Sequence, residues 1–173
     1  RRQRQMCIRD SCEALGSRNT LGQLPEVIAK QLEVMPNLTL TDGAYILASD
    51  VFEVLKDFVD RTNCNPTFIG YDPSRYEILK GLIDDYFFDV DNERQMRIKQ
   101  GFAMSDYIKL MKEKLKDKSL VHNSPILQWS LKNFGVRVGT SGDLMAMKMN
   151  DSEKIDPVVA LVMALQTAVI KVF

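Results

Sequence analysis

Two Asp-Pro dipeptides constrain this sequence more than any other feature. Asp72-Pro73 ends the apolar segment Phe68-Ile69-Gly70-Tyr71, and Asp156-Pro157 opens the apolar segment that follows it. Proline suits the first position of a helix, where no amide hydrogen is needed. Each dipeptide therefore predicts a helix start and places one carboxylate at the end of a structural element, where α/β folds gather their chemistry.

Length and composition set the outer limits of the interpretation. At 173 residues the chain suits one domain with a sizeable core. Its 23 basic and 23 acidic side chains cancel, so polyanion binding must come from local patches. Three cysteines and a single histidine, without metal-ligand spacing, argue against zinc and favour a reducing cytosol. Residues 158–173 are apolar but too few to cross a membrane, so we expect a buried helix there.

The alternation of helical and strand patterns predicts an α/β fold, in which helices flank a mixed sheet. Strands are expected at residues 38–40, 44–47, 67–71, 86–90, 119–121, 134–138 and 144–149. Helices are expected at residues 50–61, 73–85, 103–118 and 124–133, and from residue 156 onward. The turn signals Asp42-Gly43 and residues 139–142 predict that the first two and the last two strands form hairpins.

The N-terminal segment differs from the rest of the chain. Residues 1–11 follow neither helical nor strand periodicity, and they resemble a translated sequencing-adapter junction more than native sequence. A disordered basic arm is the alternative. Residues 25–33 predict a weak helix. We therefore expect a poorly structured segment at residues 1–36 and one domain at residues 37–173.

The carboxylates of Asp72 and Asp156 allow two interpretations. Each is explained by helix capping alone, which is worth about 1 kcal/mol. Together they can also meet at one sheet edge and hold Mg²⁺, which prefers one or two carboxylates plus waters and phosphate oxygens. Two such ions, roughly 3.5–4 Å apart, would clamp the attacking and leaving oxygens of a phosphodiester. Spacing alone leaves both interpretations open.

Several basic side chains are candidate nucleic-acid contacts. They are Lys112 and Lys116 on one helix flank, Lys148 and Lys154 near the second Asp-Pro, and His122. A solvated helix face and a hydrogen-bonded structural histidine are the simpler explanations. The sequence carries no Walker A motif, nucleophile elbow or dinucleotide fingerprint, so neither an ATPase site nor a hydrolase triad is indicated.

Four ordered blocks together resemble the nuclease domain of the large terminase subunit of tailed bacteriophages, over about residues 38–170. They are Ile69-Gly70-Tyr71-Asp72-Pro73, then Met104-Ser105 with the helix after it, then residues 120–129 with Asn133, and finally Lys148 with residues 154–165. The set is specific because the blocks occur in the expected order, although each block alone is weak.

The resemblance implies a ribonuclease H-like fold and a metal-dependent endonuclease that cuts concatemeric double-stranded DNA during genome packaging. Asp72 and Asp156 match two of the family's metal-binding, catalytic residues, and two Mg²⁺ or Mn²⁺ ions are implied. The block around His122 carries no assigned catalytic role. The implied partners are double-stranded DNA, the terminase small subunit and the capsid portal, with no membrane. The implied location is the cytoplasm of the infected bacterium.

The chain also departs from the family pattern. A further metal-binding aspartate ends the family's first core strand, and residues 12–36 contain no strong apolar strand ending in Asp. The ATPase half is absent as well. We therefore expect an N-terminally truncated nuclease domain that lacks its first core strand, with weakened metal binding and catalysis. A non-catalytic DNA-binding or packaging-assembly module stays open as an alternative, as does another ribonuclease H-like nuclease such as a resolvase or transposase.

Overall fold

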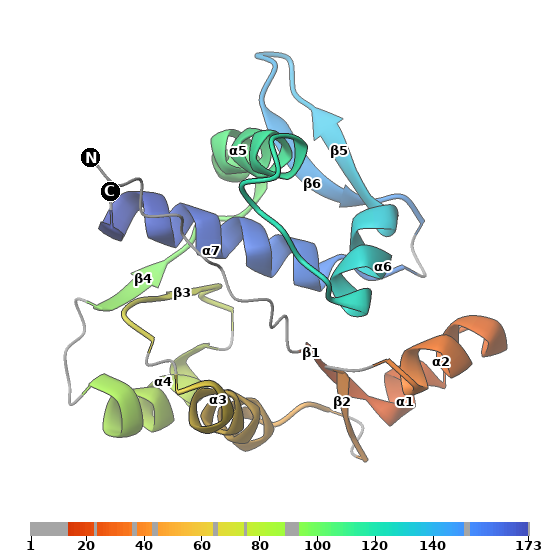
Figure 1. The fold of residues 1–173 in the computed structure, drawn as a ribbon, viewed down its shortest axis with the longest axis vertical. Coiled ribbons are helices and arrows are strands. Elements are labelled where there is room, and N and C mark those ends of the chain that lie inside the picture. The colour runs from red at the N-terminus through yellow and green to blue at the C-terminus, as the bar shows by residue number, and fades with distance from the viewer. Residues whose placement is uncertain are drawn as a thin grey trace.

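The computed structural model describes residues 14–22, 24–35, 38–42, 45–63, 66–74, 76–88, 94–150 and 153–172. Helices and short strands alternate along these residues, as the sequence predicts for an α/β fold (Figure 1). The suspected non-native segment, residues 1–11, lies outside the described residues. Among the helices that are described, none combines the length and the hydrophobicity that crossing a bilayer requires.

Most of the described residues belong to helices, and the strands between them are short. The helices are α1 (Arg18–Leu21), α2 (Glu26–Glu33), α3 (Ala48–Thr62), α4 (Tyr76–Ile83), η1 (Asp84–Phe88, π-helical), η3 (Gly101–Met104, 3₁₀), α5 (Ser105–Lys116), α6 (Pro125–Asn133) and α7 (Asp156–Val172). The strands are β1 (Ala14–Ser17), β2 (Leu38–Thr41), β3 (Ile69–Tyr71), β4 (Gln95–Arg97), β5 (Phe134–Val138) and β6 (Leu144–Lys148).

The described strands form three separate pairs, and the prediction of one mixed sheet is wrong for this part of the chain. β1 and β2 are parallel, β3 and β4 are parallel, and β5 and β6 are antiparallel. The helix α7 contacts both α5 and β3, and its position accounts for the separation of the pair β3–β4 from the pair β5–β6. In Figure 1, α7 lies between the layer of α5, β5 and β6 and the layer of β3 and β4, so these strands cannot join.

The N-terminal part of the chain is more ordered than we expected. The helix predicted at residues 25–33 is confirmed as α2, but β1 and α1 precede it within the segment 1–36. β1 pairs with β2 in the register Ala14 to Leu38. Residues 45–47 are not a strand, so the hairpin predicted between residues 38–40 and 44–47 is wrong for the part of it that the structure describes. Asp42, at the predicted turn, accepts a 2.8 Å hydrogen bond from Arg18 Nε.

Two further strand predictions are wrong for local reasons. Residues 86–88, the described part of the strand expected at residues 86–90, belong instead to η1, which continues α4 and begins where the Lys80 ammonium pairs with the largely buried Asp84 carboxylate. Residues 89–90 lie outside the described residues. Residues 119–121 form a bend after α5, where Asp117 Oδ1 accepts a 2.8 Å hydrogen bond from the Ser119 amide. The Ser119 hydroxyl, and then its amide, hold the pKa of the exposed Asp117 carboxyl below its usual value.

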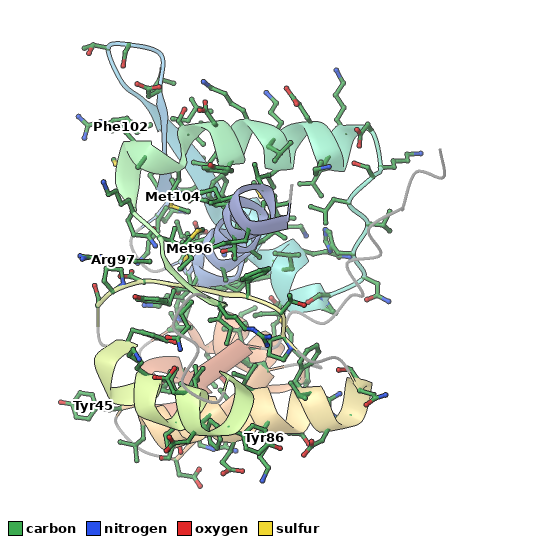
Figure 2. All side chains as sticks on the ribbon, turned by 90° about the vertical axis from the view of Figure 1, so that its left-hand side faces the viewer. Tyr45, Tyr86, Met96, Arg97, Phe102 and Met104 are labelled. Carbon is green, nitrogen blue, oxygen red and sulfur yellow. The ribbon has the colours of Figure 1, made fainter. Side chains whose placement is uncertain are left out.

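The largest core cluster is built around α7. Val158 and Val162 of this helix are completely buried, and Leu165 is 2 % exposed. They pack with Met104, Ile108, Met111, Leu120 and Leu127, which come from η3, α5, the following loop and α6. In Figure 2, Met104 lies inside the molecule, whereas Tyr45 projects from its edge. The predictions for α3, α5, α6, α7 and the β5–β6 hairpin are confirmed to within a few residues.

Candidate functional site

Asp72 lies directly after β3, on a turn that leads into α4. Its side chain is exposed, and its Oδ1 accepts a 2.9 Å hydrogen bond from the Ser74 amide. α4 begins only at Tyr76, so this bond closes a turn and does not cap the helix. The ring of Tyr76 stacks on that of Tyr71 with centroids 3.7 Å apart, which fixes the turn between the two residues. One oxygen of Asp72 is thus held, and the carboxylate faces solvent.

Asp156 is the first residue of α7, and its side chain is exposed. The Ile155 carbonyl accepts a 3.0 Å bond from the Val159 amide, so Ile155 occupies the cap position and Asp156 lies in the first turn. Within the described part of the chain, the Asp156 carboxylate has no hydrogen bond and no ion pair. The positive end of the helix dipole favours an anion at this position. Its oxygens are therefore available to an external ligand.

β3 and α7 pack against each other and run in opposite directions. The Lys171 ammonium, near the end of α7, lies 5.9 Å from the Phe68 ring centroid, just before β3. Two residues later, Gly70 packs against Thr167, one turn earlier in α7. In Figure 1, β3 runs toward the end of α7 at which that helix begins. Asp72 directly follows β3 and Asp156 is the first residue of α7, so continuing this register carries Asp72 toward Asp156. For a strand that runs along the α7 axis from the contact of Gly70 with Thr167, ~1.5 Å per helical residue and ~3.3 Å per strand residue put the two Cα atoms about 10 Å apart along that axis.

This register supports the prediction that both carboxylates belong to the same end of the molecule. The distance between their oxygens stays a prediction. In the described residues, no group of three or more His, Cys, Asp or Glu side chains is placed to hold a metal ion. The donor set at this end is thus two exposed carboxylates, Asp72 with one oxygen bonded to a backbone amide and Asp156 with both oxygens available.

The predicted nucleic-acid contacts are not gathered at one place. Lys112 and Lys116 are exposed on α5, whereas Ile108 and Met111 of the same helix are buried in the core. Lys148 is exposed at the end of β6, opposite Phe134. Lys154 is half-buried two residues before Asp156 and is the basic candidate nearest to it in sequence.

His122 lies in the segment between α5 and α6 and is partly buried. Its Nδ1 atom is fully buried and has no hydrogen-bond partner among the described residues. A structural histidine normally satisfies both ring nitrogens, so the simple structural interpretation is incomplete here. A role in nucleic-acid binding stays a prediction.

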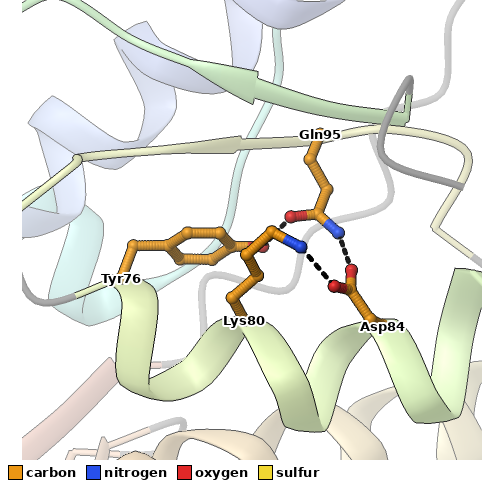
Figure 3. A network of polar contacts seen from close by, with 4 residues as sticks. All are labelled: Tyr76, Lys80, Asp84 and Gln95. Atoms are coloured by element: carbon orange, nitrogen blue, oxygen red, sulfur yellow. Dashed lines mark hydrogen bonds and ion pairs between the residues drawn. The ribbon is translucent and has the colours of Figure 1, made fainter. Parts of the chain in front are cut away.

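Sequence reasoning missed the polar network that joins α4 and η1 to β4 (Figure 3). Tyr76 Oη donates a 2.7 Å hydrogen bond to Gln95 Oε1, Gln95 Nε2 donates to Asp84 Oδ1, and Lys80 Nζ donates to Asp84 Oδ2. The spacing of Lys80 and Asp84, one helical turn apart, was the only available signal. The network ties β4 to α4 and η1, and β4 pairs with β3, the strand that Asp72 follows.

Known proteins share the fold and part of the sequence of this chain. The chain is similar in structure to the large terminase of bacteriophage HK97, with a TM-score of 0.68 and 19% identity over 87% of this chain and 32% of that chain. It therefore has a fold that is also found in a phage large terminase. In sequence it is 52% identical, over 132 residues, to the terminase large subunits of Lactococcus phages p2 and SK1.

These matches take in 76% of this chain and 24% of each Lactococcus phage protein, so the chain spans about a quarter of the length of those relatives. The model of the terminase large subunit endonuclease domain matches residues 23–171. The chain belongs to this family. The match begins within the segment 1–36, upstream of the domain start expected at residue 37.

Proposed function

We propose that this chain is the metal-dependent endonuclease domain of a DNA-packaging terminase, and that it cuts concatemeric double-stranded DNA. The observation that carries the proposal is the direction of β3 against α7, which carries the exposed carboxylates of Asp72 and Asp156 toward the same end of the molecule. Membership of the terminase endonuclease-domain family supports the reaction class.

The donor set fits Mg²⁺ or Mn²⁺. These ions bind one or two carboxylates and complete their shells with waters and phosphate oxygens. With metal–oxygen distances of ~2.1 Å and ions ~3.5–4 Å apart, a two-ion site spans about 8 Å between carboxylate oxygens. An axial offset of about 10 Å between two Cα atoms is compatible with that span. When bound, the ions would supply an activated water and would stabilise the leaving oxygen.

The protein side chains would act by orientation and charge. The Ser74 amide holds one oxygen of Asp72 and so presents the carboxylate in one direction. Asp156 adds its negative charge at the first turn of α7, on a backbone fixed by the buried Ile155 and Val158. We propose that Lys154, which precedes Asp156 by two residues, offsets the charge of a DNA phosphate. The same proposal implies the small subunit and the capsid portal as partners, and the host cytoplasm as the location.

The direct test is nicking of supercoiled plasmid by a longer terminase chain that includes residues upstream of this domain. We expect cleavage with Mn²⁺ and none with excess chelator. Replacement of Asp72 by asparagine should reduce the nicking rate at least ~100-fold, beyond the roughly 10- to 100-fold typical of outer-shell residues. DNA binding by the variant, measured by electrophoretic mobility, is the control and should be retained. Nicking at the wild-type rate would contradict the proposal and favour a DNA-binding or packaging-assembly module.

A second prediction concerns Lys112 and Lys116. They lie one turn apart on the exposed face of α5, so a DNA backbone along this face would contact both. The double replacement by alanine should reduce the slope of log K against log salt by roughly 1–2, because about one counterion is released per phosphate contact. Replacing the exposed Lys99, which lies outside α5, should leave the slope unchanged and is the matched control. An unchanged slope in the double variant would remove α5 from the DNA-binding surface.

A further inference from the structure

At Gly70 the backbone of β3 packs tightly against α7. A Cβ atom added there would overlap Thr167 Oγ1, and it would lie 3.3 Å from Thr167 Cβ and 3.2 Å from Ile98 Cγ1. Gly101 and Gly142 have positive φ angles, whereas Gly70 does not. The glycine is therefore needed for space and not for backbone conformation.

Thr167 and Ile98, the residues that Gly70 contacts, cannot move aside easily. The Thr167 hydroxyl donates a 2.9 Å hydrogen bond to the Met163 carbonyl, and Thr167 is 5 % exposed. Ile98, the third member of the contact, is completely buried. Since buried side chains are close-packed, an added methyl group is expected to push β3 away from α7.

Because of the residues around this contact, the effect of an added methyl group is concentrated at Gly70. A groove of about 410 Å³ lies beside it between β3 and α7, lined by the small residues Ala160, Ala164 and Ala168 and by residues 67–70. On the α7 side the groove is lined by these alanines and Thr167, whereas Phe68 and Ile69 line its strand side. The contact of Gly70 with Thr167 therefore limits how closely strand and helix can approach.

We infer that Gly70 and Thr167 are positioning residues that set the separation of Asp72 and Asp156. The inference rests on the proposed metal site. Asp72 follows Gly70 by two residues, so a displacement of the strand at Gly70 moves the carboxylate with it. Metal ligands must be held within about 0.5 Å of their working geometry. A shift of one carbon radius at Gly70 exceeds that tolerance.

The test measures the dissociation constant of Mn²⁺ by titrating the shift in melting temperature of the chain. We expect Gly70→Ala to raise this constant at least tenfold. Gly70→Ala with Thr167→Ala should return it to within threefold of wild type, because the overlapped oxygen is removed. The combination with Thr167→Ser should lie between them, since a serine hydroxyl can rotate away. If Gly70→Ala alone does not fold, the comparison of the two double variants still tests the inference.

Gly81→Ala is the matched control. It makes the same chemical change on α4, where an added Cβ meets nothing within 4 Å, and it should bind Mn²⁺ like wild type.

A Gly70→Ala variant that melts at a lower temperature but keeps the wild-type dissociation constant for Mn²⁺ would show a merely structural role and would overturn the inference. The inference would also be overturned if the double variant Gly70→Ala with Thr167→Ala bound Mn²⁺ no more tightly than Gly70→Ala alone. Wild-type protein with no Mn²⁺ response would overturn both this inference and the proposed function. A response lost in Asp156→Asn but kept in Gly70→Ala would overturn the inference alone.

Discussion

Asp156→Asn is expected to abolish most of the stabilisation that Mn²⁺ gives the folded chain. At a free ion concentration about 100 times the dissociation constant, the wild-type protein should gain about 2.7 kcal/mol, or roughly 5–10 °C in melting temperature. Asparagine keeps the shape of the side chain but removes the charge that a hard divalent cation requires. The shift in the variant should fall below about 2 °C, as measured by differential scanning fluorimetry with and without chelator.

The substitution should cost little without metal, because the Asp156 side chain is exposed and makes no hydrogen bond or ion pair in the described part of the chain. Loss of its interaction with the helix dipole is worth about 0.3–1 kcal/mol. Asp60→Asn, on the exposed face of α3, removes the same charge elsewhere and should keep the full Mn²⁺ shift. Equal metal-induced shifts in wild type and Asp156→Asn would rule out a metal-ligand role for Asp156.

Leu165→Ala is expected to have the largest effect on stability. Leu165 is 2 % exposed and belongs to the cluster that joins α7 to η3, α5 and α6. Truncating a buried leucine leaves a cavity and costs about 2–5 kcal/mol. The melting temperature should fall by roughly 6–15 °C for a chain of this size.

Ile170→Ala is the control for this experiment. Ile170 lies on the same helix but is 52 % exposed, and alanine is the better helix former. Its free energy of unfolding, from urea denaturation, should stay within about 0.5 kcal/mol of wild type. If both variants lost equal stability, α7 would not form the centre of the core.

Local sequence patterns correctly predicted the elements whose signals lie within a few residues of each other. α5 and α7 carry apolar side chains at helical spacing, and both are confirmed. α6 is confirmed from its cap, because Ser124 Oγ accepts a hydrogen bond from the Leu127 amide and Pro125 occupies the first turn. The turn at residues 139–142 likewise predicted the β5–β6 hairpin.

The strands that depend on distant partners could not be predicted. β4 has the polar sequence Gln95-Met96-Arg97, and it becomes a strand because it pairs with β3 and because Gln95 bonds to Tyr76. The aromatic residues of η1 favoured a strand, but the Lys80–Asp84 pair continues the helix. β1 lacks β-branched and aromatic side chains, so its sequence gives no indication of a strand.

The candidate site was predicted in part. The two Asp-Pro dipeptides correctly placed Asp72 after a strand and Asp156 at a helix start. The functional use of the carboxylates stays a prediction. The role inferred for Gly70 could not be predicted from the sequence, because it depends on which residue of α7 faces the strand. That information exists only once the helix has packed.

The central place of α7 bears on the order in which the domain can be completed during synthesis. Its residues bury Ile108 and Met111 on one side and contact β3 on the other, although α6 and the β5–β6 hairpin separate α7 from α5 in the sequence. Until the ribosome has released residue 165, α7 cannot cover these apolar surfaces. The nascent chain would then be exposed to aggregation, and a chaperone that binds apolar segments would have its main opportunity in that interval.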